Sequence, residues 1–168
     1  MTLPAPSLEP SETHAQPQPG GSEFLNDYLL FLLAAASASA SAGFHAQARA
    51  AGVKVPEWRA LACLHDTDGQ MITRLAALAL MEQSAMTRVI ERMEARGLVQ
   101  RDGDRQDRRR VRVWLTEEGR ACVTDLVARA RQHEAEVLAL LSDAEQALIK
   151  PLLGRLLAAL PGNPLARG

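Results

Sequence analysis

Apolar residues recur with helical spacing along most of the chain. The clearest case is the segment 82–97, in which positions i, i+3, i+4 and i+7 are taken by Met86, Val89, Ile90 and Met93. This spacing places the four side chains on one face of a helix and predicts that they enter a core. Gly97 is typical of a helix stop. The shorter segment 72–80 predicts another helix just before it.

Two helices are predicted upstream of this pair. An Ala/Leu/Ser-rich stretch from Ser22 to about Ala51 predicts a long helix, and its small residues would let another helix approach closely. Gly52 ends it. Pro56 then stands where the first turn of a helix tolerates proline, and the residues that follow it predict the second helix.

Two more helices are predicted downstream from their capping residues. Thr116 is an N-cap residue followed by two glutamates, whose charges complement the helix dipole, so a long helix begins there. The sequence "SDAE" at 142–145 is a capping box that begins a last helix, which ends near Leu160 before Pro161.

The segment between the two halves has strand-like alternation. Val111, Val113 and Leu115 alternate with Arg112 and Trp114. Together with the preceding "LVQR", this run flanks the charged loop "DGDRQDRRR" at 102–110 and predicts a β-hairpin. Two short helices followed by such a hairpin predict a mainly α fold containing a winged helix-turn-helix.

The charge is unevenly distributed. The whole chain carries a net charge of −1, but nine of its seventeen arginines lie between Arg88 and Arg112, against five acids. This stretch therefore carries +4 and the remainder −5. Local clustering of this kind favours a nucleic-acid partner that the overall charge would not suggest.

Composition also bears on the compartment. Residues 1–21 contain five prolines and two glycines with few large apolar groups, which predicts a disordered tail. The strongly apolar run that begins at Tyr28 covers about nine residues, far short of the roughly twenty needed to span a bilayer. No basic residue precedes Arg49, as a signal peptide would require, and two cysteines are too few for a disulfide framework. We therefore expect a cytoplasmic protein without a membrane partner.

Polar residues of the segment 82–97 fit a DNA major groove. Hydroxyl groups near a helix start allow close approach, and guanidinium groups can bond guanine bidentately, so the candidate contacts are Ser84, Thr87, Arg88 and Arg92. The hairpin arginines can reach phosphates or the adjacent minor groove: Arg105, Arg108, Arg109 and Arg110. The carboxylates of Asp104 and Asp107 are expected to hold these arginines in fixed rotamers before DNA arrives.

The segment 97–120, "GLVQRDGDRQDRRRVRVWLTEEGR", resembles the MarR family of winged-helix regulators. That family has a D-x-x-D-R-R pattern followed by L-T-x-x-G, matched here by Asp104, Asp107, Arg108 and Arg109 and then by Leu115, Thr116 and Gly119. The match covers about residues 56–122. A third consecutive arginine, Arg110, departs from the pattern and leaves its role open.

The resemblance implies a homodimer that binds a pseudo-palindromic operator, usually as a repressor. It also implies release from DNA by a small aromatic or phenolic acid. By position, Ser84, Thr87 and Arg88 would face the major groove, and Arg105 would be at the wing tip. The implied organisation is a helical dimerisation region from residues 22–55 and 116–162 around a DNA-binding region at 56–115.

Three residues are candidate ligand contacts: His45, Trp58 and His65. An indole and imidazoles near a boundary between lobes suit a planar anion, although packing is the more common role for such residues. Cys63 and His65 lie two residues apart, about 200° around a helix, so they do not predict a shared metal ion. No metal or other cofactor is expected.

The sequence also bears on classes of function other than a DNA-binding regulator. The chain has no glycine-rich phosphate loop, no G-x-S-x-G motif and no histidine-rich ligand cluster, so we do not expect an enzyme. Two alternatives stay open. One is a regulator that senses oxidants through Cys63 or Cys122. The other is a protein-interaction module that uses the winged helix to contact another protein.

Overall fold

The computed structural model describes residues 24–103 and 111–165. The chain divides into two compact units, residues 1–37 and 38–168. The described part of the first unit consists of the short helix α1 (Phe24–Asp27) and the first part of α2 (Leu29–Ala50). The sequence predicted one helix here. Tyr28 separates the two, although its amide still donates to the Phe24 carbonyl at 2.8 Å, so the break is a single residue.

The helices of the first unit expose many large apolar side chains. Those with more than two fifths of their surface accessible are Phe24, Leu25, Tyr28, Leu29, Leu30, Phe31 and Leu32. By length and composition, α2 is also a helix that could cross a membrane, a criterion that core helices meet as well. The sequence did not predict a helix long enough to cross a membrane, because only the nine residues from Tyr28 were counted as apolar. The Ala/Ser-rich residues that follow them extend the helix.

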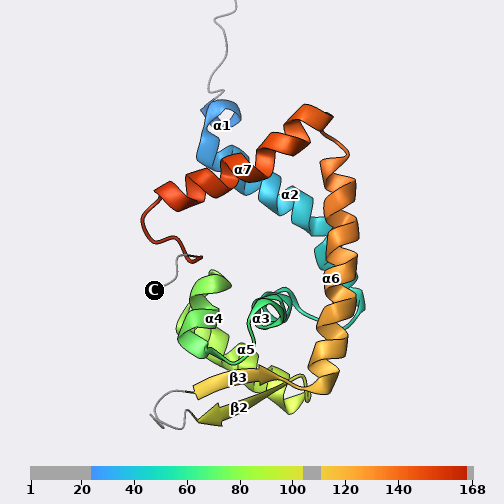
Figure 1. The fold of residues 1–168 in the computed structure, drawn as a ribbon, viewed down its shortest axis with the longest axis vertical. Coiled ribbons are helices and arrows are strands. Elements are labelled where there is room, and N and C mark those ends of the chain that lie inside the picture. The colour runs from blue at the N-terminus through green and yellow to red at the C-terminus, as the bar shows by residue number, and fades with distance from the viewer. Residues whose placement is uncertain (1–23, 104–110, 166–168) are drawn as a thin grey trace, which may run out of the picture. The chain divides into compact units, whose positions relative to one another are not determined.

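The second unit contains the remaining helices and a small sheet (Figure 1). Their order along the chain is α3 (Val55–Asp66), β1 (Gln70–Met71), α4 (Ile72–Leu78), α5 (Gln83–Ala95), β2 (Val99–Gly103), β3 (Val111–Leu115), α6 (Glu117–Leu138) and α7 (Asp143–Ala159). The mainly helical fold with a β-hairpin after two short helices confirms the predicted winged helix-turn-helix.

The sheet is antiparallel with strand order β1-β3-β2. The hairpin register pairs Val99 with Leu115 and Gly103 with Val111. β1 contributes two residues, which pair with Val113 and Arg112 of β3. The sequence did not predict β1, because two residues are too few to show an alternating pattern.

One core joins the helix-turn-helix to the hairpin and to the first turns of α6. The four periodic residues of α5 are all buried, as predicted: Met86, Val89, Ile90 and Met93. They share a cluster with Val113 and Leu115 of β3 and with Val123 and Leu126 of α6. The beginning of α6 is therefore part of the winged-helix core.

The junction between β3 and α6 explains the L-T-x-x-G motif. Leu115 is buried, and the Thr116 hydroxyl accepts from the Gly119 amide at 3.0 Å, which confirms Thr116 as the N-cap. The same hydroxyl donates to the Gly97 carbonyl at 2.6 Å. A Cβ on Gly119 would lie 1.9 Å from the Leu98 carbonyl oxygen, so only glycine fits there.

The last helix begins at the predicted capping box. The Ser142 amide and hydroxyl both donate to the Glu145 carboxylate, at 2.8 and 2.6 Å. α7 buries none of its residues within the unit. Its exposed leucines are Leu148, Leu152, Leu153 and Leu156, and Leu160 at its C-cap is exposed as well.

Candidate nucleic-acid interface

The turn between α4 and α5 sets the direction of α5. Leu80 adopts a left-handed backbone conformation, with φ of 55°. The Met81 amide then donates back to the Ala76 carbonyl at 2.9 Å, which closes α4 in the manner of a Schellman motif. α5 begins at Gln83, three residues after Leu80, so the chain makes the sharp turn of a helix-turn-helix.

The face of α5 opposite the core is polar and exposed. Ser84, Arg88 and Arg92 are exposed, and Thr87 is half-buried. The structure thus gathers the four predicted contacts of this helix on its outer side, since Met86, Val89 and Ile90 are turned inward. An outer surface of hydroxyl and guanidinium groups on such a helix suits the major groove.

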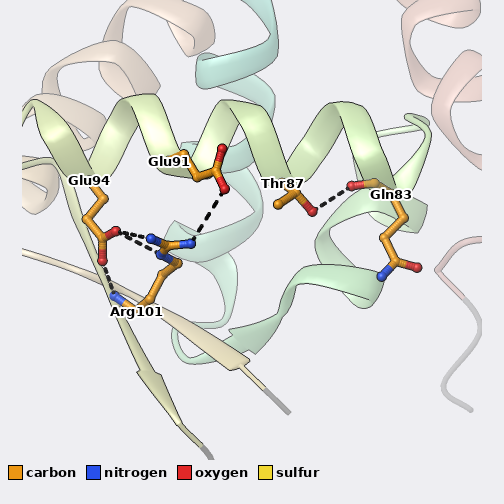
Figure 2. A network of polar contacts seen from close by, with 5 residues as sticks. All are labelled: Gln83, Thr87, Glu91, Glu94 and Arg101. Atoms are coloured by element: carbon orange, nitrogen blue, oxygen red, sulfur yellow. Dashed lines mark hydrogen bonds and ion pairs between the residues drawn. The ribbon is translucent and has the colours of Figure 1, made fainter. Parts of the chain in front are cut away.

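The hydroxyl of Thr87 is already engaged within the helix. It donates to the Gln83 carbonyl at 3.0 Å (Figure 2). Because the proton is used in this bond, the free lone pairs and the methyl group are what the side chain offers to a partner. An adenine or cytosine amino group and a thymine methyl group would match these features.

The C-terminal end of α5 is attached to the beginning of α3. Arg96, the residue after α5, donates to the Glu57 carboxylate at 2.8 Å and to the Gly52 carbonyl at 2.9 Å. Glu57 is only 1% exposed and also accepts from the Lys54 amide at 2.9 Å. The sequence did not predict this ion pair between an exposed arginine and a buried glutamate, since its members lie 39 residues apart.

Asp68 attaches the hairpin to the turn that precedes β1. Its carboxylate accepts from the amides of Gly69 and Leu115, at 3.0 and 2.9 Å, and from the Arg120 guanidinium at 2.5 Å. The side chain of Trp114 covers Gly69, where a Cβ would lie 2.4 Å from the indole ring. These contacts fix the base of the hairpin against the rest of the unit.

A second ion-pair cluster joins the hairpin to α5. Arg101 of β2 contacts Glu94 and Glu91, as Figure 2 shows. Neither this ion pair nor a role for Glu91 was predicted from the sequence. The turn at Gly97 was a cue to this contact. A strand that follows a helix directly after such a turn returns along the last turns of that helix.

The predicted contacts in the hairpin loop lie outside the described residues. These are Arg105, Arg108, Arg109 and Arg110, together with Asp104 and Asp107 as the residues expected to orient them. The described parts of the hairpin, β2 and β3, end at Gly103 and resume at Val111.

The predicted ligand residues line two hollows between α3 and α6, the first of which is also bordered by the second half of α2. The first hollow, of about 270 Å³, includes His45 and Trp58 with Phe44, His133 and Glu134. The second, of about 280 Å³, includes Trp58 and His65 with Arg131 and Glu134. Trp58 thus borders both hollows, whereas His45 and His65 each border one.

Packing around the first hollow is aromatic. Phe44 meets the Trp58 ring edge to face, with centroids 4.8 Å apart. The His133 Nε2 donates to the Ala40 carbonyl at 2.7 Å, and a Cβ on Gly43 would lie 2.8 Å from the His133 ring. Gly43 therefore allows α6 to approach α2 closely at this point.

Electrostatics differ between the two ends of this hollow. Burial lowers the pKa of His45, and the positive charges of Arg59 and Arg49 add to the effect. Hydrogen bonds from Lys150 and Arg131 lower the pKa of Glu134, so that group is an anion at neutral pH. The neutral imidazole with two arginines nearby is the end suited to an anionic ligand.

The two thiols are poorly suited to rapid oxidation. Burial raises the pKa of Cys63, with a further increase from the charge of Asp66, and burial also raises the pKa of Cys122. Both are then protonated at neutral pH, and the thiolate is the reactive form. Within residues 24–103 and 111–165, no group of three His, Cys, Asp or Glu side chains could hold a metal ion.

A helix-turn-helix, a hairpin wing and a long helix that restarts directly after it define the class of winged-helix DNA-binding proteins. Residues 53–111 match the model of the MarR family. The chain belongs to the MarR family of transcriptional regulators.

The relatives are regulators as well. The chain is 55% identical to the MarR family transcriptional regulator SPO1453 from Silicibacter pomeroyi, over 82% of this chain and 98% of that structure, with a TM-score of 0.74. It is 31% identical to the transcriptional regulator HosA of Escherichia coli, over 62% of this chain and 77% of HosA. The MarR family protein Rv2887 of Mycobacterium tuberculosis, solved with salicylic acid, is 30% identical over 76% of this chain and 95% of that structure, with a TM-score of 0.64.

Proposed function

We propose that the protein is a homodimeric repressor that binds a pseudo-palindromic operator and is released by a small aromatic or phenolic acid. The observation that carries this proposal is the outer face of α5. It presents hydroxyl and guanidinium groups beside the hairpin, while its inner face is locked into the core. As a regulator of this kind acts on chromosomal DNA, we place it in the cytoplasm.

In this proposal α5 enters the major groove. Ser84, Thr87 and Arg88 read base edges, and Arg92 contacts the backbone or a further base. The hairpin arginines, Arg105, Arg108, Arg109 and Arg110, add affinity through phosphates or the minor groove, oriented by Asp104 and Asp107. The DNA-binding region is then residues 56–115.

Exposed apolar faces support the dimer. The leucines of α7 and the apolar side chains of α1 and of the first part of α2 are exposed in the single chain. Such clusters of exposed large apolar side chains are uncommon on proteins that remain monomeric. We therefore assign residues 22–55 and 116–162 to dimerisation, with the first turns of α6 also serving the winged-helix core.

The hollows at Trp58 support an effector site. Each has a volume of a few hundred cubic ångströms, an aromatic wall and basic side chains near it, which suits a planar carboxylate. Salicylic acid is bound by the relative Rv2887. His45 and Trp58 would contact the ligand in one hollow, and Trp58 and His65 in the other.

The test of DNA reading is a comparison of two arginine variants. Arg88→Ala is expected to weaken binding to a duplex selected by the wild-type protein from a random library by about 1 to 3 kcal/mol. It should also relax the preference at one base position in each half-site. Arg129→Ala is the matched control, because Arg129 lies on α6 in an ion pair with Asp125. Equal losses for Arg88→Ala on selected and random DNA would contradict base reading.

The effector is tested by release of the same duplex. Salicylate and related aromatic acids are added to the complex, with hydrogen peroxide and divalent metal ions as controls. Release by aromatic acids that is lost in Trp58→Ala supports the proposed site. Release by peroxide alone would instead favour sensing through Cys63 or Cys122.

A further inference from the structure

The carboxylate of Glu94 on α5 is bound almost entirely by one residue of the wing. The Arg101 guanidinium donates to Glu94 through Nε at 2.8 Å and contacts it through Nη2 at 2.6 Å. The Arg101 backbone amide donates to the other carboxylate oxygen at 3.0 Å. The third nitrogen, Nη1, lies 3.9 Å from the Glu91 carboxylate. Figure 2 shows this arrangement.

These carboxylates lie on the part of α5 that we assign to DNA. Glu91 is three residues from Arg88 and adjacent to Arg92, so its charge is within a turn of both. An unpaired carboxylate at this place would repel phosphates and attract the neighbouring arginines away from them. The charges of Glu91 and Glu94 thus have to be compensated for α5 to approach DNA closely.

Arg101 is badly placed to contact DNA itself. The Nε and Nη2 edge of its guanidinium is occupied by Glu94, and Nη1 faces Glu91. The side chain is about one third exposed. The pair also lowers the pKa of Glu94, through the hydrogen bond from Arg101, so the carboxylate is charged at neutral pH and the ion pair persists.

We propose that Arg101 promotes DNA binding indirectly, as a positioning residue that masks the charges of Glu94 and Glu91 while joining the wing to α5. This inference rests on the proposed function. It differs from the usual reading of a wing arginine, in which the guanidinium contacts a phosphate.

The two readings make different predictions for a double variant. Arg101→Ala should weaken binding to the selected duplex about fivefold or more, because the Glu94 carboxylate loses its two short contacts with the guanidinium; the contact with Glu91, at 3.9 Å, contributes the smaller part. Glu94→Gln alone should leave affinity within about threefold of wild type. In the double variant Arg101→Ala/Glu94→Gln, affinity should return to within about threefold of Glu94→Gln. If Arg101 contacted a phosphate, the double variant would bind as weakly as Arg101→Ala, and that result overturns the proposal.

Two further variants check charge and folding. Arg101→Lys keeps the positive charge and should retain binding within about threefold, although it loses the two-pronged contact. Arg129→Ala removes the same charge on α6 and should leave affinity unchanged. Circular dichroism and thermal melting of every variant show whether a loss of binding is a loss of fold. If Arg101→Ala is unfolded, the comparison of Arg101→Lys with Arg101→Gln replaces it, with the same expected rescue by Glu94→Gln.

A measurement without DNA separates this inference from the proposed function. Carboxyl NMR titration should give Glu94 a pKa below the ordinary glutamate value in the wild type. In Arg101→Ala the pKa should return to the ordinary value. An undepressed pKa in the wild type overturns the ion pair. A depressed pKa in a protein that selects no DNA sequence overturns the proposed function and the masking role but leaves the ion pair established.

Discussion

At the scale of single residues, Glu57 stands out because it is the charged residue that is buried in the described part of the chain. It is almost fully buried, and its oxygen Oε2 accepts from Arg96 and from the Lys54 amide. Buried carboxylates are costly unless every lone pair finds a donor. Arg96 also binds the Gly52 carbonyl, so one guanidinium joins the end of α5 to the turn before α3.

Removing this guanidinium should destabilise the fold. We expect Arg96→Ala to lower the free energy of unfolding by about 1 to 3 kcal/mol, because Glu57 loses its charged partner and the Gly52 carbonyl loses a donor. Urea denaturation followed by circular dichroism measures the change. The exposed Arg129→Ala control should change stability by less than about 0.5 kcal/mol. Similar effects for the two variants would mean that the pair with buried Glu57 contributes nothing beyond a surface ion pair.

At the scale of elements, the sequence predicted what local rules control. The helical periodicity of α5 identified its buried face, and the capping residues Thr116 and Ser142 located the beginnings of α6 and α7 to within a residue. The contacts that position the candidate site were not predicted. Arg96 with Glu57, and Asp68 with Arg120, join residues 39 and 52 positions apart, and no local pattern encodes such a distance. The hollows at Trp58 likewise depend on how α2, α3 and α6 pack.

The junction of β2 with α6 depends on the absence of a side chain at Gly119. Gly119→Ala would place a methyl group 1.9 Å from the Leu98 carbonyl oxygen, which is a backbone atom with little freedom to move. We expect a loss of about 1 to 3 kcal/mol in the free energy of unfolding, together with weaker DNA binding because the wing shifts relative to α5. Thermal melting and binding to the selected duplex test both effects.

Gly103, the last residue of β2, provides a control for this variant. Among the residues that the structure describes, no atom lies within 4 Å of a Cβ placed on Gly103, so Gly103→Ala should melt within a few degrees of the wild type. If Gly119→Ala melts at the same temperature as Gly103→Ala, the close approach at Gly119 is not a constraint on the junction.

At the scale of the whole molecule, the exposed leucines of α7 determine the expected oligomer. Leu152 and Leu156 are four residues apart on α7, and 49% and 37% of their surfaces are exposed. We expect Leu152→Glu/Leu156→Glu to convert the proposed dimer into a monomer, because two charges would have to be buried in an apolar interface. Light scattering at micromolar concentration measures the mass. Arg155→Glu, which is also on α7, is the charge control, and a wild-type monomer would contradict the proposed dimer.

The pKa of His45 predicts how an effector should depend on pH. In the free protein, burial and the arginines Arg59 and Arg49 lower this pKa, so His45 is neutral at neutral pH. A bound carboxylate favours the protonated imidazole, so binding takes up a proton. Affinity for salicylate should therefore increase as the pH falls from about 8 to about 6.

His45→Gln is the control, since glutamine keeps a polar group without a titration. His133 and Glu134 line the same hollow and are retained in this variant. Glu134 has a lowered pKa and stays charged over this range. Calorimetry in two buffers of different ionisation enthalpy measures the proton uptake. A pH dependence that is identical in wild type and His45→Gln would assign the proton to another group.

The beginning of α6 is buried in the winged-helix core, while the rest of the helix extends well beyond it (Figure 1). A helix of this length, 22 residues, measures about 33 Å, so a tilt of the helix would turn about the buried residues Val123 and Leu126 as a pivot. The far end of the helix, Leu138, lies roughly 20 Å from the pivot, so a tilt of about 5° moves it by roughly 2 Å. Ala130, His133 and Glu134, which border the hollows, lie between pivot and tip. A ligand that displaces these residues by a fraction of an ångström would therefore shift the far end of α6 by more. In the proposed dimer, this shift would change the spacing between the two α5 helices.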